Sequence, residues 1–285
     1  MPRRSRSGNG CGGHPGLTIR SMIRDVPDPV IVMSLDGLRI ATYDFGADAG
    51  LPADAPVVVA VHGFASSAPA NWEATGWVRE LTRAGCRVVA LDQRGHGASA
   101  KPHDRAAYTM AHLVADLTAV IDTYLIDELA LVGYSLGARV GWHAALELPH
   151  RITRLVLGGI PDGDPLTRFQ VDEARAFLDG GPAVSDPLTA TYLKVAGTLP
   201  GNDLTALVSL VEGMRGGAQP DPANPPTQPV LFATGSEDRI LEKSRGLAAA
   251  TPRSEFFEIP GRNHFNAPVS REFRERAVEF VTRGI

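Results

Sequence analysis

A serine between two glycines is the residue of this chain best suited to act as a nucleophile. Residues 133–137 read GYSLG, the pattern G-x-S-x-G. The apolar run 129–132 predicts a buried strand before it, and the periodicity of 136–148 predicts a helix after it. A sharp turn from strand to helix lifts the serine hydroxyl clear of the backbone, and the two glycines avoid Cβ clashes in that turn. We therefore predict that Ser135 is a nucleophile.

A serine hydroxyl needs a base, which in turn needs a group that orients it. After a strand–serine–helix turn of this kind, the chain order is serine, acid, histidine. Of the eight histidines, only His264 lies beyond His150, in the segment GRNHF that follows the predicted strand 256–259. We predict that His264 accepts the proton of Ser135.

Two aspartates are candidates for the group that orients His264. Asp238 follows the predicted strand 230–234. Asp162 lies beyond the predicted strand 152–157 and could reach the same place from the neighbouring strand. We favour Asp238, and Asp162 stays open as the alternative.

When a hydroxyl attacks a carbonyl group, negative charge develops on the carbonyl oxygen and needs hydrogen-bond donors. The backbone amide of Leu136, at the positive end of the predicted helix, is one candidate. The amide of Phe64, in the segment HGF after the predicted strand 57–61, is the other. His62 precedes the serine in the chain, so we expect it to shape this loop rather than to act as the base.

Strands and helices alternate along most of the chain and would position these residues. A hairpin is predicted over 30–34 and 38–43, joined by the Asp36-Gly37 turn. Further strands are predicted at 57–61, 86–91, 129–132, 152–157, 230–234 and 256–259, and helices at 110–125, 136–148 and 271–282. This alternation predicts an α/β fold whose mostly parallel sheet is covered by helices on both faces.

The alternation stops between residues 161 and 228, where three short helical patterns are separated by turns (166–178, 188–195 and 204–214). An insert of this length inside a compact domain is typical of a lid. We predict a helical cap at 161–228 and a core formed by 29–160 and 229–285. Apolar cap residues could line a substrate pocket: Phe169, Phe177, Tyr192 and Leu207. Three cap arginines could instead hold a substrate carboxylate: Arg168, Arg175 and Arg215.

Composition excludes several other classes of function. A net charge of −4 gives no basic surface for nucleic acid, and two cysteines provide neither a disulfide framework nor a cysteine zinc site. The glycine-rich segment 92–99 lacks the spacing of a nucleotide-binding loop, and no clustered histidine and carboxylate spacing suggests a metal site, so neither a cofactor nor a metal is expected. Residues 1–28 are expected to be a disordered arm without a signal sequence, and no apolar run is long enough for a membrane span, which favours a cytoplasmic protein. The sequence carries no signal for an oligomeric state.

Five segments in order give the chain a family resemblance: HGF (62–64), DQRGHGAS (92–99), GYSLGAR (133–139), GSED (235–238) and GRNHF (261–265). From about Val30 to its end the chain resembles the α/β-hydrolase superfamily. The resemblance implies eight mostly parallel strands, a cap after the sixth, the triad Ser135, Asp238 and His264, and an oxyanion hole formed by the amides of Phe64 and Leu136.

The resemblance also bears on the reaction. Haloalkane dehalogenases and epoxide hydrolases of this fold carry aspartate at the strand-to-helix turn, called the elbow, where this chain has Ser135. The serine therefore argues against both activities. We expect hydrolysis of a small carboxylic ester through an acyl-enzyme. The segment GYSLGAR is also similar to the elbow of menaquinone-pathway lyases and of C–C bond hydrolases. A cofactor-free perhydrolase and a non-catalytic ligand-binding protein on the same fold are the remaining alternatives.

Overall fold

The structure is a computed structural model of the chain that describes residues 26–46, 50–160, 162–163 and 166–284. The predicted N-terminal arm, residues 1–28, lies outside the described residues except for its last three. In the part of the chain that is described, no helix is long and apolar enough to cross a membrane.

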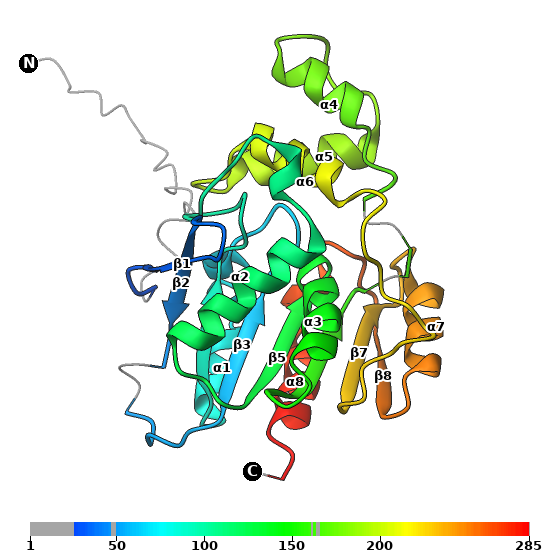
Figure 1. The fold of residues 1–285 in the computed structure, drawn as a ribbon. Coiled ribbons are helices and arrows are strands. Elements are labelled where there is room, and N and C mark those ends of the chain that lie inside the picture. Colours follow the sequence, from blue (N-terminus) through cyan, green and yellow to red (C-terminus); the bar gives the residue numbers. More distant parts are fainter. Residues whose placement is uncertain (1–25, 47–49, 161, 164–165, 285) are drawn as a thin grey trace, which may run out of the picture.

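In the described part of the chain, eight strands form one sheet in the order β1-β2-β4-β3-β5-β6-β7-β8 (Figure 1). The pairs β1–β2 and β2–β4 are antiparallel, and every other neighbouring pair is parallel, which confirms the predicted fold class. The strands are β1 (Val30–Met33), β2 (Arg39–Asp44), β3 (Val57–Val61), β4 (Arg87–Leu91), β5 (Leu129–Tyr134), β6 (Ile152–Gly158), β7 (Val230–Gly235) and β8 (Ser254–Ile259).

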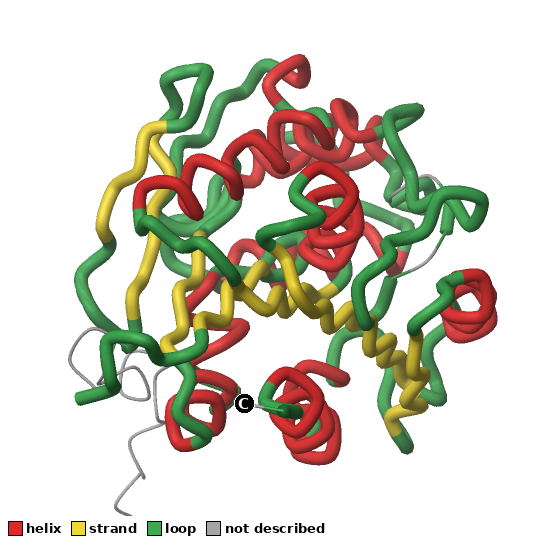
Figure 2. Tube along the Cα trace, turned by 60° about the horizontal axis from the view of Figure 1, so that its bottom comes forward, coloured by secondary structure: helices red, strands yellow, loops and turns green. Residues whose placement is uncertain are grey.

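The central strands are apolar throughout because both of their faces are buried. In β3, Val59 and Val61 belong to one hydrophobic core, whereas Val58 and Ala60 belong to a second core on the opposite face. Figure 2 shows the strands as a twisted band between two layers of helices. Because successive side chains of a strand point to opposite faces, a continuous β-branched run is the expected sequence for this position.

The helices of the core cover both faces of the sheet. Helices α2 (Met110–Thr123) and α3 (Leu136–Glu147) pack together over one core, and α1 (Trp77–Arg83) packs with α8 (Arg271–Val281) over the other. Helix α7 (Leu241–Ala250) packs against β7 and β8. Short turns of helix, η2 (Pro69–Glu73), η3 (Arg105–Ala107) and η4 (Ala267–Val269), lie in the loops. Neither α1 nor α7 is among the helices that the sequence pattern predicts.

Among the residues that the structure describes between β6 and β7, where the alternation of the sequence stops, three helices are found. They are α4 (Val171–Leu178), α5 (Pro187–Thr198) and α6 (Leu204–Met214), and Figure 1 shows them together above the sheet, with α4 farthest from it. Helix α4 begins only at Val171, five residues later than the pattern suggested. Asp186 starts α5 because its carboxylate accepts a hydrogen bond from the Thr189 amide at 2.8 Å. The division into core and cap stays a prediction.

Two buried imidazoles join the loops that follow β3 and β4. The Gln93 amide donates to Nε2 of His62 at 3.1 Å, and the Ala65 amide donates to Nε2 of His96 at 3.1 Å. The other ring nitrogen of His62, Nδ1, lies 2.7 Å from the carbonyl oxygen of Gly63. In His96, Nδ1 lies 3.2 Å from the carbonyl oxygen of Arg94. Each Nε2 is therefore an acceptor, and both rings are neutral.

Burial agrees with this hydrogen-bond pattern. Both rings are fully buried, and loss of solvation lowers the pKa of His62 and holds the pKa of His96 well below its ordinary value. A charged ring at either position would lose the hydrogen bond from the backbone amide that it now accepts. The loops that follow β3 and β4 thus depend on two uncharged histidines.

We expect mild acid to destabilise the fold through these rings. In the unfolded chain a histidine takes up a proton below about pH 6.5, whereas the lowered pKa keeps the folded ring neutral there. The unfolded state then binds more protons, so the free energy of unfolding falls as the pH drops below about 6.5. Denaturant unfolding at pH 7.5, 6.5 and 5.5 measures this slope, which His96→Gln should reduce by up to about 1.4 kcal/mol per pH unit.

The control for this slope is His150→Gln, because His150 is exposed. It should leave the pH dependence of unfolding as it is in the unmodified protein. If His96→Gln and the unmodified protein had the same slope, the assignment of a neutral buried ring would be wrong.

Candidate active site

Ser135 occupies a strained turn between β5 and α3. Its backbone has φ 53° and ψ −110°. Residues other than glycine rarely adopt this conformation, which costs about 1–3 kcal/mol. A Cβ atom on Gly133 would lie 2.4 Å from the carbonyl oxygen of Gly137, and one on Gly137 would lie 2.0 Å from that of Val61. The G-x-S-x-G pattern is therefore a steric requirement of the close approach of α3 to β3 and β5.

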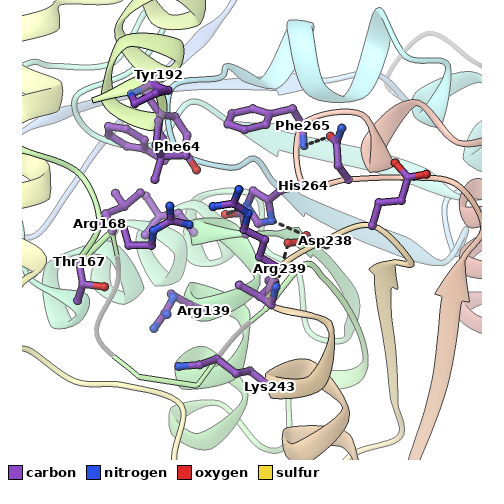
Figure 3. Close-up of a pocket in the computed structure, with 18 of the residues that line it drawn as sticks. Phe64, Arg139, Thr167, Arg168, Tyr192, Asp238, Arg239, Lys243, His264 and Phe265 are labelled. Atoms are coloured by element: carbon purple, nitrogen blue, oxygen red, sulfur yellow. Dashed lines mark hydrogen bonds and ion pairs between the residues drawn. The ribbon is translucent and has the colours of Figure 1, made fainter. Parts of the chain in front are cut away.

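The serine hydroxyl begins a chain of hydrogen bonds. Oγ of Ser135 lies 2.8 Å from Nε2 of His264, and Nδ1 of the same ring lies 2.8 Å from Oδ2 of Asp238 (Figure 3). Because a carboxylate only accepts hydrogen bonds, Nδ1 carries the proton. Nε2 is left as an acceptor that faces the serine hydroxyl, which is the orientation that a general base needs.

The histidine and the aspartate are held by their own loops. The hydroxyl of Tyr134 donates to the carbonyl oxygen of His264 at 2.7 Å, which fixes the loop after β8 against the elbow. The second carboxylate oxygen of Asp238 accepts a hydrogen bond from the Ile240 amide at 3.2 Å, and the residue is only 7% exposed. The three side chains follow β5, β7 and β8, whose carboxyl ends meet at one edge of the parallel sheet.

The alternative acid, Asp162, points elsewhere. Its carboxylate lies 3.3 Å from the ammonium group of Lys243, and 44% of its side chain is exposed. The Nδ1 atom that it would have to contact is bonded to Asp238 instead. The structure thus brings Asp238, and not Asp162, to His264.

The amides proposed for an oxyanion hole lie beside the serine. Gly63 precedes Phe64, and a Cβ atom on it would lie 3.3 Å from Cβ of Ser135. Leu136 is the first residue of α3, where backbone N–H groups have no partner within the helix. Among the hydrogen bonds of the described residues, neither the Phe64 amide nor the Leu136 amide is a donor. Their role as donors to a substrate stays a prediction.

A cavity of about 670 Å³ opens onto the hydroxyl and the imidazole. One part of its wall is aromatic: the ring of Tyr192 lies 5.3 Å from that of Phe64 and 5.2 Å from that of Phe265. Burial, with a smaller contribution from the charge of Asp238, raises the pKa of Tyr192 to about 12, so its hydroxyl stays protonated. Charged residues of both signs also line the cavity, the cationic ones being Arg139, Arg168, Arg239 and Lys243 and the acidic ones Asp162, Asp186, Glu237 and Asp238.

Of the four residues predicted to line a substrate pocket, only Tyr192 lines this cavity, and its contact with a substrate stays a prediction. Phe169 and Leu207 are each 1% exposed and belong to the hydrophobic core, where Phe169 packs edge-on against Phe64 at 6.2 Å. Phe177 is 41% exposed and does not line the cavity. The prediction is corrected for these three, because packing buries Phe169 and Leu207 in the core and leaves Phe177 exposed outside the cavity lining.

Of the three cap arginines proposed to hold a substrate carboxylate, one lines the cavity and two do not. Arg168 lines the cavity. Arg175 pairs with Glu212 at 2.6 Å, and Arg215 donates to the carbonyl oxygen of Phe169. Both hold helices of the insert together.

Sequence reasoning missed three of the four cationic residues of the cavity. Arg139 lies four positions after Ser135, one helical turn away, and Arg239 directly follows Asp238. These spacings are a usable signal once the serine and the acid are assigned. Lys243 carried no such signal. In the described part of the chain, no group of three or more histidine, cysteine or acidic side chains could hold a metal ion.

Comparisons with known proteins agree with this architecture. A family model for the alpha/beta hydrolase fold matches residues 56–183. Epoxide hydrolase B of Mycobacterium tuberculosis (H37Rv) is 37% identical over 133 residues, which is 46% of this chain and 35% of that protein. The chain thus matches about a third of the length of that relative. The AB hydrolase superfamily protein YfhM of Bacillus subtilis (strain 168) is 28% identical over 236 residues, 70% of this chain and 79% of that protein.

Solved structures share the fold over nearly the whole chain. The enol-lactonase of Burkholderia xenovorans LB400 superposes with a TM-score of 0.72 over 89% of this chain and 100% of that one, at 21% identity. Epoxide hydrolase A of Mycobacterium thermoresistibile gives a TM-score of 0.68 over 90% and 98% of the two chains, at 22% identity. At these identities the likeness shows the fold alone. By its sequence matches, its sheet and its strand-to-helix turn, this chain has the α/β-hydrolase fold.

Proposed function

We propose that this protein hydrolyses a small carboxylic ester, open or cyclic, through an acyl-enzyme formed on Ser135. The observation that carries the proposal is the pair of 2.8 Å hydrogen bonds that join Ser135 to His264 and His264 to Asp238. A nucleophile, a base with its acceptor nitrogen free for the proton, and an orienting acid are the parts that acyl transfer needs.

In the first half of the reaction, Oγ of Ser135 attacks the carbonyl carbon while its proton passes to Nε2 of His264. Asp238 holds the Nδ1–H group and stabilises the imidazolium ion that forms. The oxygen of the tetrahedral intermediate takes hydrogen bonds from the amides of Phe64 and Leu136. The intermediate collapses as the C–O bond to the alcohol breaks, and His264 returns its proton to the departing alkoxide.

In the second half, water replaces the alcohol. His264 takes a proton from the water while the hydroxide oxygen attacks the acyl carbon. The bond to Oγ of Ser135 then breaks, the proton returns to the serine, and the carboxylic acid leaves. For a cyclic ester, alcohol and acid leave as one molecule.

The nature of the nucleophile separates this reaction from the one named for some of the relatives. Attack of a serine hydroxyl on an epoxide carbon would form an ether, which has no carbonyl group for water to attack. The enzyme would then be trapped after one turnover. Ser135 at the elbow therefore supports ester hydrolysis and not epoxide hydrolysis for this chain.

Replacement of the nucleophile is the first test. Ser135→Ala should lower kcat for p-nitrophenyl esters by about 10⁴-fold or more, because no acyl-enzyme can form. Reaction with a fluorophosphonate, followed by mass spectrometry of the intact protein, should label the unmodified protein once and the variant not at all.

The matched control is Ser254→Ala, because Ser254 lies at the opposite, amino end of β8. It should keep both the activity and the label. Ester hydrolysis that survived Ser135→Ala would refute the proposal, and a folded protein that takes no label would favour a non-catalytic ligand-binding protein. Turnover of a diketone with none of the esters would favour a C–C bond hydrolase.

Exchange of the acid tests the second assignment. Asp238→Asn should lower kcat by about 10⁴-fold, since an amide can no longer hold His264 with its proton on Nδ1. Asp162→Asn should change kcat only a few-fold, because Asp162 makes no contact with the imidazole. Steady-state kinetics of the two variants decide between them, and the opposite ranking would assign the role to Asp162.

A further inference from the structure

The wall of the active-site cavity is divided by chemistry. Figure 3 shows the rings of Tyr192 and Phe265 above His264, and Arg139 and Lys243 below it. The side chains of Arg168 and Arg239 lie beside the imidazole. A substrate whose carbonyl group reaches Ser135 therefore meets apolar rings on one side and positive charge on the other.

Four acidic residues line the cavity as well, and two of them act on its cations: Asp162 pairs with Lys243 at 3.3 Å, and the pKa of Asp186 is lowered by hydrogen bonds from Thr189 and, to a smaller extent, by the charge of Arg168. Asp238 is bonded to His264, Asp186 accepts hydrogen bonds from the amide and hydroxyl of Thr189, and Asp162 lies beside Lys243. Each of these three carboxylates already has a partner within the protein. The remaining one, Glu237, is exposed.

Three guanidinium groups face the cavity in addition to Lys243. Among the described residues, neither Arg168 nor Arg239 forms an ion pair or a side-chain hydrogen bond, and both are exposed. Arg139 is only 3% exposed and lies one turn of α3 beyond Ser135.

We propose that the ester cleaved by this protein carries a carboxylate on its acyl part, and that Arg168 and Arg239 bind that carboxylate. The inference rests on the proposed function, because it names the class of ester taken by the same site. The planar fork of a guanidinium matches the two oxygens of a carboxylate, which makes arginine well suited to such recognition. Arg139 adds positive potential from the wall beneath.

Matched pairs of esters test the inference. The p-nitrophenyl esters of butanoate, pentanoate and hexanoate are compared with the mono-p-nitrophenyl esters of succinate, glutarate and adipate, in which a carboxylate replaces the terminal methyl group. At one chain length at least, kcat/KM of the acidic ester should exceed that of its neutral partner about tenfold or more. No preference at any length would overturn the inference and leave ester hydrolysis standing.

Variants show whether the named arginines cause the preference. Arg168→Gln/Arg239→Gln should lower kcat/KM for the preferred acidic ester about tenfold, mainly through KM, and change that for the neutral ester less than twofold. The control is Arg83→Gln, since Arg83 is exposed on α1, outside the cavity, and it should leave both values unchanged. Equal losses for the two esters would mean that the arginines do not read the carboxylate.

A binding measurement separates this inference from the proposed function. Titration calorimetry on Ser135→Ala, which cannot form the acyl-enzyme, compares the monomethyl esters of succinate, glutarate and adipate with methyl butanoate, pentanoate and hexanoate. At one length the acidic ester should bind about tenfold more tightly, and the double arginine change should remove the difference. If the unmodified protein cleaved no ester while this difference remained, the hydrolysis would be wrong and the carboxylate site right; equal binding at every length would reject the site.

Discussion

The close approach of α3 to the sheet is the constraint on which the site depends. Glycine at positions 133 and 137 lets the helix begin directly against β3 and β5, since a Cβ atom at either position would lie within 2.4 Å of a backbone carbonyl oxygen. This geometry forces Ser135 into a positive φ, which holds its hydroxyl above the edge of the sheet. The strain is local, and it is balanced by a core that is buried on both faces of the central strands.

Around that elbow, the remaining parts are held by bonds between loops rather than by the sheet itself. Tyr134 joins the elbow to the loop of His264, and the neutral rings of His62 and His96 join the loop of Phe64 to the segment after β4. Each of these contacts uses a buried polar group whose replacement would leave a partner unsatisfied. Preorganisation of the site therefore depends on buried hydrogen bonds as much as on the fold.

The parts of the fold and of the site that the sequence could predict are those that burial and chain order determine. The core strands were predictable because burial on both faces demands unbroken apolar runs, and His264 because no other histidine follows His150. Helix α7 was not, since its buried positions include only Leu247, Ala248 and a serine, too weak a pattern to recognise. The wrong pocket residues have a similar cause: Phe169 and Phe177 are equally apolar in the sequence, and only tertiary packing buries one and exposes the other.

Two of the cationic residues that line the cavity are held by the same elements as Ser135 and Asp238. Arg139 lies one turn after Ser135 on α3, and Arg239 directly follows Asp238, so each is held by the element that holds a member of the hydrogen-bonded chain. Arg168, by contrast, is exposed and belongs to the segment between β6 and β7. Substitutions there can change which substrate fits without moving Ser135 or His264, whereas changes at Arg139 act on the buried start of α3 as well. Substitutions at Arg168 can therefore alter the proposed substrate preference separately from catalysis, whereas substitutions at Arg139 affect both.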